Sequence, residues 1–273
     1  MLTARFATLT STNDAAARWT RRDPGRWLRV TADAQTAGRG RSTRSWSSPR
    51  GGLWMSLAAP LSTPPAERAP LPLIVGIAVR DQLASLCRRH DRKDAAIEIK
   101  WPNDVLLDGC KIAGILCEQV LNAEAAAHGV LPAILGIGIN ANLRVADLGS
   151  ELRTPAATLR ETLGRCVDLD PFTDALSRAI VEEVERWDRE GVSSATVTRL
   201  NEALAWRGER VELHPTVHAE VGSPCLTLAG VDRAGRLTGI DDDGRRRALD
   251  AGEIHALAPC DADPSSRLAL ASA

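Results

Sequence analysis

Four short segments of the 273-residue chain combine residue types that could bind or activate a ligand. The first is rich in glycine and arginine and reads Ala37-Gly38-Arg39-Gly40-Arg41-Ser42-Thr43-Arg44-Ser45-Trp46. Four arginines and no acidic residue lie between Ala34 and Ala66, in a chain whose net charge is −1. Glycine lets the backbone approach a ligand closely, and guanidinium groups pair with carboxylate or phosphate oxygens. The segment predicts an anion-binding loop, although its composition also suits a solvated surface loop or an RNA contact.

Two further segments lie close together along the chain. In Lys100-Trp101-Pro102-Asn103-Asp104 an alternating strand stops at a proline and presents an amide beside a carboxylate. Such oxygen atoms can hold a metal or a ribose, but Pro-Asn-Asp is also ordinary turn chemistry. Lys111 follows the turn Asp108-Gly109 and precedes Ala113-Gly114, so a lysine stands near a residue without a side chain. A lysine on an exposed hairpin is otherwise merely solvated.

The fourth segment is Leu135-Gly136-Ile137-Gly138-Ile139-Asn140. Its alternating glycines leave one face of a strand clear for a flat group. It is a weak dinucleotide fingerprint, because the third glycine and the following helix are missing. Only three of the 34 basic residues are lysines, and two of them, Lys100 and Lys111, fall within these segments. Since lysine and arginine differ in pKa, hydration and shape, we expect these two positions to need a lysine.

The apolar pattern predicts the elements that must position these segments. Strands are expected at 28–34, 52–58, 97–101, 105–107, 112–116 and 131–140, with a hairpin at Asp108-Gly109. Helices are expected after a capping box formed by Ser11 and Asp14, over 71–89, and from Asp170-Pro171 to Gly191. Beyond Arg207 the runs at 211–213, 217–221, 226–231, 236–240, 245–249 and 254–257 predict a small β-barrel. We therefore expect domains at 1–205 and 206–260, followed by a tail at 261–273.

Composition argues against several classes of protein. The hydrophobic content of 44% and the charged content of 25% are typical of a globular chain, and the near-zero net charge disfavours a broad nucleic-acid surface. The longest apolar runs are shorter than the about 20 residues that cross a bilayer. Six cysteines form no Cys-x-x-Cys pair, so we expect free thiols in a reducing cytoplasm rather than disulfides or a zinc site. The chain contains neither a P-loop nor a Gly-x-Ser-x-Gly elbow.

Taken together and in order, five segments closely resemble the motifs of biotin protein ligases. They are Ser11-Thr12-Asn13, Gln35-Thr36-Ala37-Gly38-Arg39-Gly40-Arg41, Lys100-Trp101-Pro102-Asn103-Asp104, Lys111-Ile112-Ala113-Gly114-Ile115-Leu116 and Gly136-Ile137-Gly138-Ile139-Asn140. Near the end of the chain, Gly252-Glu253-Ile254 is similar to the C-terminal barrel of that family. The resemblance implies an α+β fold. Its catalytic domain has a mixed β-sheet with helices, as in class II aminoacyl-tRNA synthetases and lipoate ligases, and a small C-terminal barrel of the Src-homology-3 type follows.

The resemblance also implies a reaction with two steps. Biotin and ATP, with Mg²⁺, give biotinyl-5'-adenylate and pyrophosphate. A lysine of a biotin carboxyl carrier protein domain, part of a biotin-dependent carboxylase, then attacks this mixed anhydride. Both steps bring anions together, so positioning and charge stabilisation are the main tasks of such a protein.

The roles of individual residues follow from the same resemblance. Lys111 and Arg41 are expected to be catalytic, and Asp104 to contact Mg²⁺. The expected biotin-binding residues are Ser11, Thr12, Asn13, Gln35, Gly38, Arg39, Gly40, Arg41, Lys111, Gly114 and Gly136. The expected ATP-binding residues are Arg41, Arg44, Trp46, Asn103, Asp104, Lys111 and Asn140. No barrel residue is assigned, because Leu249 and residues 257–258 stand where some relatives carry an aromatic residue and an arginine.

Two other functions remain open at this stage. A lipoate or octanoate ligase would share the adenylate chemistry. A non-catalytic RNA- or carrier-binding module could use the barrel and the arginine-rich segment at 37–46, which is called the arginine loop below. Because the chain begins almost directly at Ser11, we expect no N-terminal DNA-binding domain and no DNA partner. The sequence does not identify the carrier protein, and it does not distinguish a monomer from a biotin-induced homodimer.

Overall fold

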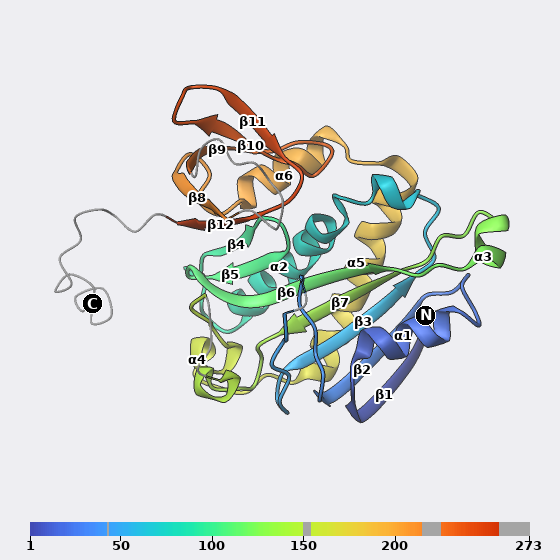
Figure 1. Cartoon of the computed structure of the whole chain (residues 1–273). Helices are drawn as coiled ribbons and strands as arrows, with labels where there is room; N and C mark the ends of the chain where they lie inside the picture. The colour runs from blue at the N-terminus through green and yellow to red at the C-terminus, as the bar shows by residue number, and fades with distance from the viewer. Residues whose placement is uncertain (43, 150–153, 215–224, 257–273) are drawn as a thin grey trace.

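A computed structural model describes residues 1–42, 44–149, 154–214 and 225–256 (Figure 1). These residues form two β-sheets, of seven and five strands, with the smaller sheet built from the C-terminal part of the chain. The expected strand at 217–221 and the tail at 261–273 lie outside the described residues. The α+β class and the mixed character of the large sheet are confirmed.

The seven-stranded sheet has the order β1-β2-β3-β7-β6-β5-β4. Its strands are β1 (Leu2–Leu9), β2 (Leu28–Gln35), β3 (Leu53–Ala59), β4 (Ile97–Lys100), β5 (Asp104–Leu107), β6 (Cys110–Gln119) and β7 (Ala133–Ile139). β1 runs parallel to β2, and the other neighbouring pairs are antiparallel. The Asp108-Gly109 hairpin is confirmed, and both residues adopt the positive φ angles, 49° and 76°, that such a turn requires.

Helices and short helical turns connect these strands. They are α1 (Thr12–Thr20), α2 (Leu71–Arg89), α3 (Ala123–Ala127), α4 (Leu159–Leu163), α5 (Leu169–Glu190), α6 (Ser194–Ala203) and the 3-10 turns η1 (Pro65–Glu67) and η2 (Val145–Leu148). The predicted span of α2 is confirmed at both ends. The sequence did not predict β1 or α6, and it misplaced two caps. Ser11 makes no side-chain cap bond on α1, and α5 is capped by Asp168 rather than Asp170.

Alternation along the central strands assigns each residue to one of two faces of the large sheet. On one face, Leu135, Ile137 and Ile139 of β7 join the main core with α2 and α5. On the other face, Ile134 packs with Ala15 and Ala16 of α1. Gly136 and Gly138 therefore lie on the α1 side, where they leave the sheet uncovered by side chains.

The five-stranded sheet has the order β11-β10-β9-β8-β12. Its strands are β8 (Arg210–His214), β9 (Cys225–Val231), β10 (Leu237–Asp241), β11 (Arg246–Leu249) and β12 (Glu253–Ala256). It lies beyond the β4 edge of the large sheet (Figure 1), where Ala205 N donates to Ile99 O at 3.0 Å. A second core joins the two sheets, since Leu73, Ile77 and Trp101 pack with Leu226 and Leu237. This small sheet is consistent with a barrel of the Src-homology-3 type.

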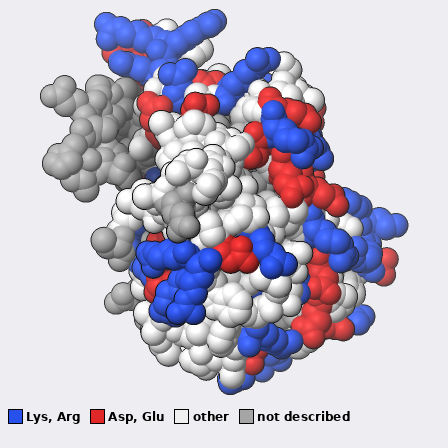
Figure 2. Space-filling model, turned by 90° about the vertical axis from the view of Figure 1, so that its right-hand side faces the viewer, with Lys and Arg blue, Asp and Glu red and all other residues white. Residues whose placement is uncertain are grey.

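The surface carries charges of both signs. Figure 2 shows basic and acidic side chains interspersed over one face of the described residues, as the net charge of −1 suggests. None of the helices in the described ranges has the length and apolar character needed to cross a bilayer.

Candidate active site

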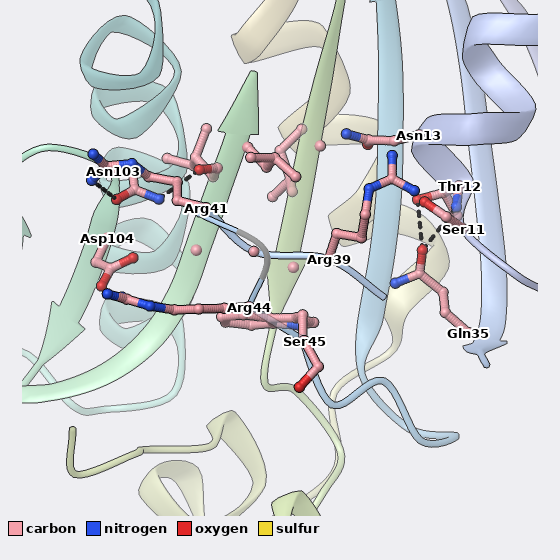
Figure 3. Close-up of a pocket in the computed structure, with 18 of the residues that line it drawn as sticks. Ser11, Thr12, Asn13, Gln35, Arg39, Arg41, Arg44, Ser45, Asn103 and Asp104 are labelled. Carbon is pink, nitrogen blue, oxygen red and sulfur yellow. Dashed lines mark hydrogen bonds between the residues drawn. The ribbon is translucent and has the colours of Figure 1, made fainter. Parts of the chain in front are cut away.

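A pocket lies on the α1 side of the large sheet, over the glycines of β6 and β7 (Figure 3). Fourteen of the sixteen site residues predicted from the sequence line it. They are Ser11, Thr12, Asn13, Gln35, Arg39, Gly40, Arg41, Arg44, Trp46, Asn103, Asp104, Lys111, Gly114 and Gly136. The other two, Gly38 and Asn140, lie behind the lining. Segments separated by up to 125 residues in the chain thus meet in one cavity.

One end of the pocket is a buried network of uncharged groups. The main-chain N–H and the hydroxyl of Thr12 both donate to Gln35 Oε1, at 2.8 and 3.1 Å. Ser56 Oγ lies 2.7 Å from Thr12 Oγ1 and 2.5 Å from Asn13 Oδ1. Ser11 is also buried here, at the start of α1. Such fixed donors and acceptors suit a neutral polar ring.

Gly38 lies behind this end of the pocket and packs closely against its neighbours. A Cβ atom at Gly38 would stand 2.5 Å from both Ser48 Oγ and Trp46 O. Ser48 in turn accepts a hydrogen bond from Gln35 Nε2 at 2.9 Å. The glycine thus allows the arginine loop to approach Gln35 closely.

Arg39 closes the loop over the same end. Its guanidinium group contacts Asp14 Oδ1 at 2.9 Å and both carboxylate oxygens of Glu118 at 3.1 Å. Although burial opposes the charge, Asp14 and Glu118 raise the pKa of Arg39. Glu118 also accepts from Asn13 Nδ2 at 2.5 Å. Asp14 is therefore used to hold the loop rather than to cap α1.

Trp46 lies flat over the glycine face that the sequence predicted to be clear. Cβ atoms at Gly114 and Gly138 would stand 2.8 and 2.7 Å from its ring atoms. The ring packs edge to face with Trp54, and Lys111 Nζ lies 5.0 Å from the Trp46 ring centroid. The indole nitrogen is buried and has no hydrogen-bond partner among the described residues.

Lys111 enters the pocket because β6 contains an irregularity. Pairing with β5 shifts between Val105 and Leu106, so that Ile112 is an extra residue in β6. As a result Ile112 joins the core, while Lys111 and Gly114 face the pocket. Lys111 Nζ forms an ion pair of 2.7 Å with Asp104 Oδ1.

Asn140 positions the main chain that carries Lys111. Its buried amide donates to Lys111 O at 3.3 Å and to Ala157 O at 3.1 Å. Its expected contact with ATP stays a prediction, because its side chain bonds to the main chain behind the pocket.

The other end of the pocket gathers positive charge. Arg41 donates to Asn103 Oδ1 at 3.3 Å and to Gly252 O at 3.4 Å, and Arg44 pairs with Glu253. Lys100 is buried behind them, with Nζ 5.6 Å from the Trp206 ring centroid. Burial lowers the pKa of both Arg41 and Lys100, against the opposing effect of nearby carboxylates. The cations Arg41, Arg44, Lys100 and Lys111 outnumber the carboxylates of Asp104 and Glu253 here. This end of the pocket is therefore positive and suited to a polyanion.

No group of three or more His, Cys, Asp or Glu residues within the described ranges is placed to hold a metal ion. Asp104 supplies one carboxylate, and Mg²⁺ commonly binds through one or two carboxylates together with substrate phosphates. The expected contact between Asp104 and Mg²⁺ stays a prediction.

Several lining residues were missed by sequence reasoning. They are Ser45, Met55, Ile115, Leu116, Ile137, Gly138 and Glu253. Gly138 carried a visible signal in its alternation with Gly136. Glu253 lies in a segment that resembled the family, but its neighbours gave no reason to place it near a site more than 110 residues earlier in the chain.

Comparison with known proteins identifies the family. The model of the biotin/lipoate A/B protein ligase family matches residues 5–140. A biotin--[acetyl-CoA-carboxylase] ligase of Paracoccus denitrificans is 32% identical over 74% of this chain and 83% of that protein. The bifunctional ligase/repressor BirA of Bacillus subtilis is 38% identical over 51% of this chain, a match that spans only 40% of that protein.

A solved structure agrees over nearly the whole chain. A biotin protein ligase from Aquifex aeolicus has a TM-score of 0.74 and 25% identity, over 93% of this chain and 97% of that one. The fold and the matched segment are those of the biotin/lipoate protein ligase class. The chain belongs to the biotin protein ligase family.

Proposed function

We propose that this ligase activates biotin with ATP to form biotinyl-5'-adenylate and then transfers biotin to a lysine of a biotin carboxyl carrier protein domain. The observation that carries the proposal is the polarity of the pocket. One end offers the neutral groups of Thr12, Asn13 and Gln35, with the charge of Arg39 paired to Asp14 and Glu118. It meets a cationic end at Lys111 and Trp46. The Aquifex aeolicus relative was solved in complex with biotin and ATP, which supports the same pair of substrates here.

In the first step a carboxylate oxygen of biotin attacks the α-phosphorus of ATP. A new P–O bond forms, the bond to the bridging oxygen breaks, and pyrophosphate leaves with the electron pair. Lys111 is proposed to neutralise the two anions where they meet, with Arg41 beside it. An ammonium group held by Asp104 is a compact charge at a fixed point, and preorganised charges of this kind stabilise a transition state strongly.

In the second step the neutral amine of the carrier lysine attacks the carbonyl carbon of the mixed anhydride. The amide bond forms, AMP leaves, and the amine loses a proton. Arg39 is proposed to retain the adenylate between the steps, because its ion pairs with Asp14 and Glu118 hold the loop over the pocket.

The two ends of the pocket receive different parts of the intermediate in this proposal. The biotin ring lies among Ser11, Thr12, Asn13 and Gln35, over Gly136, and the loop residues Gly38 and Gly40 let the chain approach it. The nucleotide lies toward Arg44, Trp46, Asn103 and Asp104. Asp104 would hold the Mg²⁺, which would supply positive charge to offset the charge of the triphosphate.

The acceptor and the cellular setting belong to the same proposal. A carrier domain of a biotin-dependent carboxylase is the proposed partner, supported by the name of the Paracoccus denitrificans relative. The cytoplasmic location and the lack of a DNA partner stay predictions from the sequence.

Pyrophosphate release tests the proposal against its nearest rival. The protein is mixed with ATP and Mg²⁺ and given biotin, lipoate or octanoate in separate reactions. Release with biotin alone is the expected result. Release with lipoate or octanoate but not biotin would assign the pocket to the other branch of the family. Failure of all three acids, together with RNA binding, would remove the enzymatic function.

A further inference from the structure

The turn at residues 250–253, just before and at the start of β12, connects the small sheet to the arginine loop. Arg41 donates to Gly252 O at 3.4 Å, and Arg44 forms an ion pair with the carboxylate of Glu253. Both arginines belong to the set proposed to bind ATP. One turn of the C-terminal sheet thus holds two guanidinium groups of a loop from the N-terminal part of the chain.

The small sheet is itself fixed to the strand that carries Lys100. Trp101 Nε1 donates to Gly235 O at 3.0 Å, and Ala205 N donates to Ile99 O at the same distance. Ile254, next to Glu253, is fully buried in the core shared by the two sheets. The position of Glu253 is therefore set by packing.

The charges around Glu253 are those that a phosphate would meet. Arg44 contacts it directly, Arg41 and Lys100 act on it through space, and His255 Nε2 lies 3.9 Å from its other oxygen. Although burial alone would raise the pKa of Glu253, Arg44, Lys100 and Arg41 hold it below its usual range. Glu253 is only 21% exposed and lines the pocket together with Arg44.

A carboxylate and a phosphate compete for the same guanidinium N–H groups, because both offer anionic oxygens at similar geometry. The two anions also repel one another at short range. While Glu253 contacts Arg44, some of the guanidinium N–H groups are occupied. A phosphate can accept hydrogen bonds from all of them only if the carboxylate moves away.

We propose that Glu253 is a positioning residue that acts as an anionic placeholder for a phosphate group. It holds Arg44 over the pocket in the absence of nucleotide and is displaced from Arg44 when ATP or pyrophosphate binds. This inference rests on the proposed function, and it adds a role for the C-terminal sheet in controlling the nucleotide end of the site.

The variant Glu253→Gln tests the placeholder, because it keeps the size of the side chain and one acceptor oxygen but removes its charge. Pyrophosphate should bind the free variant about two- to fivefold more tightly by calorimetry, the range expected for loss of one partly exposed ion pair. The KM for ATP should fall by a similar factor, while the KM for biotin stays unchanged. Asp243→Asn is the matched control, since it removes an exposed pair with Arg245 in the same sheet and should leave all three values unchanged.

Pyrophosphate binding that is unchanged or weaker in Glu253→Gln would overturn the proposal, and weaker binding would make Glu253 a permanent support of Arg44. A joint shift of both KM values with a lower Tm would likewise overturn it in favour of a purely structural role. If Glu253→Gln does not fold, Glu253→Asp is measured instead, and its shorter carboxylate should give a smaller tightening in the same direction. Pyrophosphate binding requires no turnover, so failure of the wild-type protein to activate biotin would reject the proposed function separately.

Discussion

Lys111 is one of three lysines in a chain that otherwise uses arginine for positive charge. Its ammonium group lies 2.7 Å from Asp104 Oδ1 and 5.0 Å from the centroid of the Trp46 ring, at the wall of the pocket. A planar guanidinium fork spreads the charge over several atoms and cannot concentrate it at this single point. The geometry therefore supports the expectation that this position needs a lysine.

The substitution Lys111→Arg should reduce adenylate formation by about 100-fold or more, as loss of a preorganised charge does in other enzymes. The measurement is pyrophosphate release at saturating biotin and ATP. Lys93→Arg, in a charged loop away from the pocket, serves as the control and should retain full activity. Near-normal release by Lys111→Arg would remove this residue from the chemistry.

The glycines of β7 allow the two ends of the pocket to be tested separately. A Cβ atom at Gly136 would stand 2.4 Å from Asn13 Oδ1, whereas one at Gly138 would stand 2.7 Å from Trp46 Nε1. Gly136→Ala should raise the KM for biotin, and Gly138→Ala the KM for ATP, each by about tenfold because overpacking costs roughly 1–3 kcal/mol. Each variant is the control for the other. Equal effects on both substrates in both variants would contradict the assignment of the two ends.

Sequence analysis identified most of the lining residues because they belong to five short segments that resemble the motifs of biotin protein ligases. It could not place Lys111 on the same face as Gly114, since strict alternation puts residues three apart on opposite faces. The extra residue Ile112 in β6 shifts the alternation by one position and so brings Lys111 and Gly114 to the same face. No turn or composition signal in the sequence marked this residue. Glu253 was missed for a different reason, because its role depends on how two distant sheets pack.

At the scale of elements, the arginine loop between β2 and β3 is held at both ends by ion pairs. Arg39 fastens it to α1 and β6, and Arg44 fastens it to β12. The side chains of Arg39 and Glu118 remain more than a third exposed, so each contact is individually weak. Individually weak contacts at this position are what the proposed role of Arg39 in retaining the adenylate requires.

The substitution Arg39→Ala should let biotinyl-5'-adenylate escape before transfer. The expected result is diffuse biotin labelling of a bystander protein that the wild-type enzyme leaves unlabelled, detected by mass spectrometry. Arg5→Ala removes arginine ion pairs elsewhere on the large sheet and is the matched control. If Arg39→Ala labels no more bystander protein than this control, Arg39 does not retain the adenylate.

Elements whose own residues carry a strong local signal were predicted well. Elements that form because of contacts with other parts of the chain were not. The apolar run of α2 and the Asp108-Gly109 turn contain their own signals, and both are confirmed. β1 is an exposed edge strand that is fixed by its pairing with β2, and none of its residues is buried. Asp14 had the correct spacing for a capping box but pairs with Arg39 instead, because tertiary contacts outweigh a local cap.

At the scale of the whole molecule, the two sheets share a core. Leu73, Ile77 and Trp101 of the N-terminal part pack against Leu226 and Leu237 of the small sheet. The predicted boundary at residue 205 therefore lies within a packed region, next to the hydrogen bond from Ala205 to Ile99. Two sequence units with a common core are expected to unfold together.

Calorimetry tests this coupling. The full chain should unfold in a single transition, and Ile99→Ala should lower its stability by about 2–5 kcal/mol, the usual cost of emptying a buried site. The transition should remain single in the variant. Leu86→Ala, in the main core between α2 and the large sheet, is the comparison and should also shift one transition. Two separate transitions, only one of which responds to Ile99→Ala, would show that the sheets are independent domains.

Transfer of biotin to a carrier tests the central claim most directly. The protein is incubated with biotin, ATP, Mg²⁺ and a biotin carboxyl carrier protein domain, and the intact carrier is weighed by mass spectrometry. The carrier should gain the mass of one biotinyl group, at a single lysine and only when ATP is present. An unchanged carrier mass, or a gain of a lipoyl group in a parallel reaction with lipoate but none with biotin, would contradict the account.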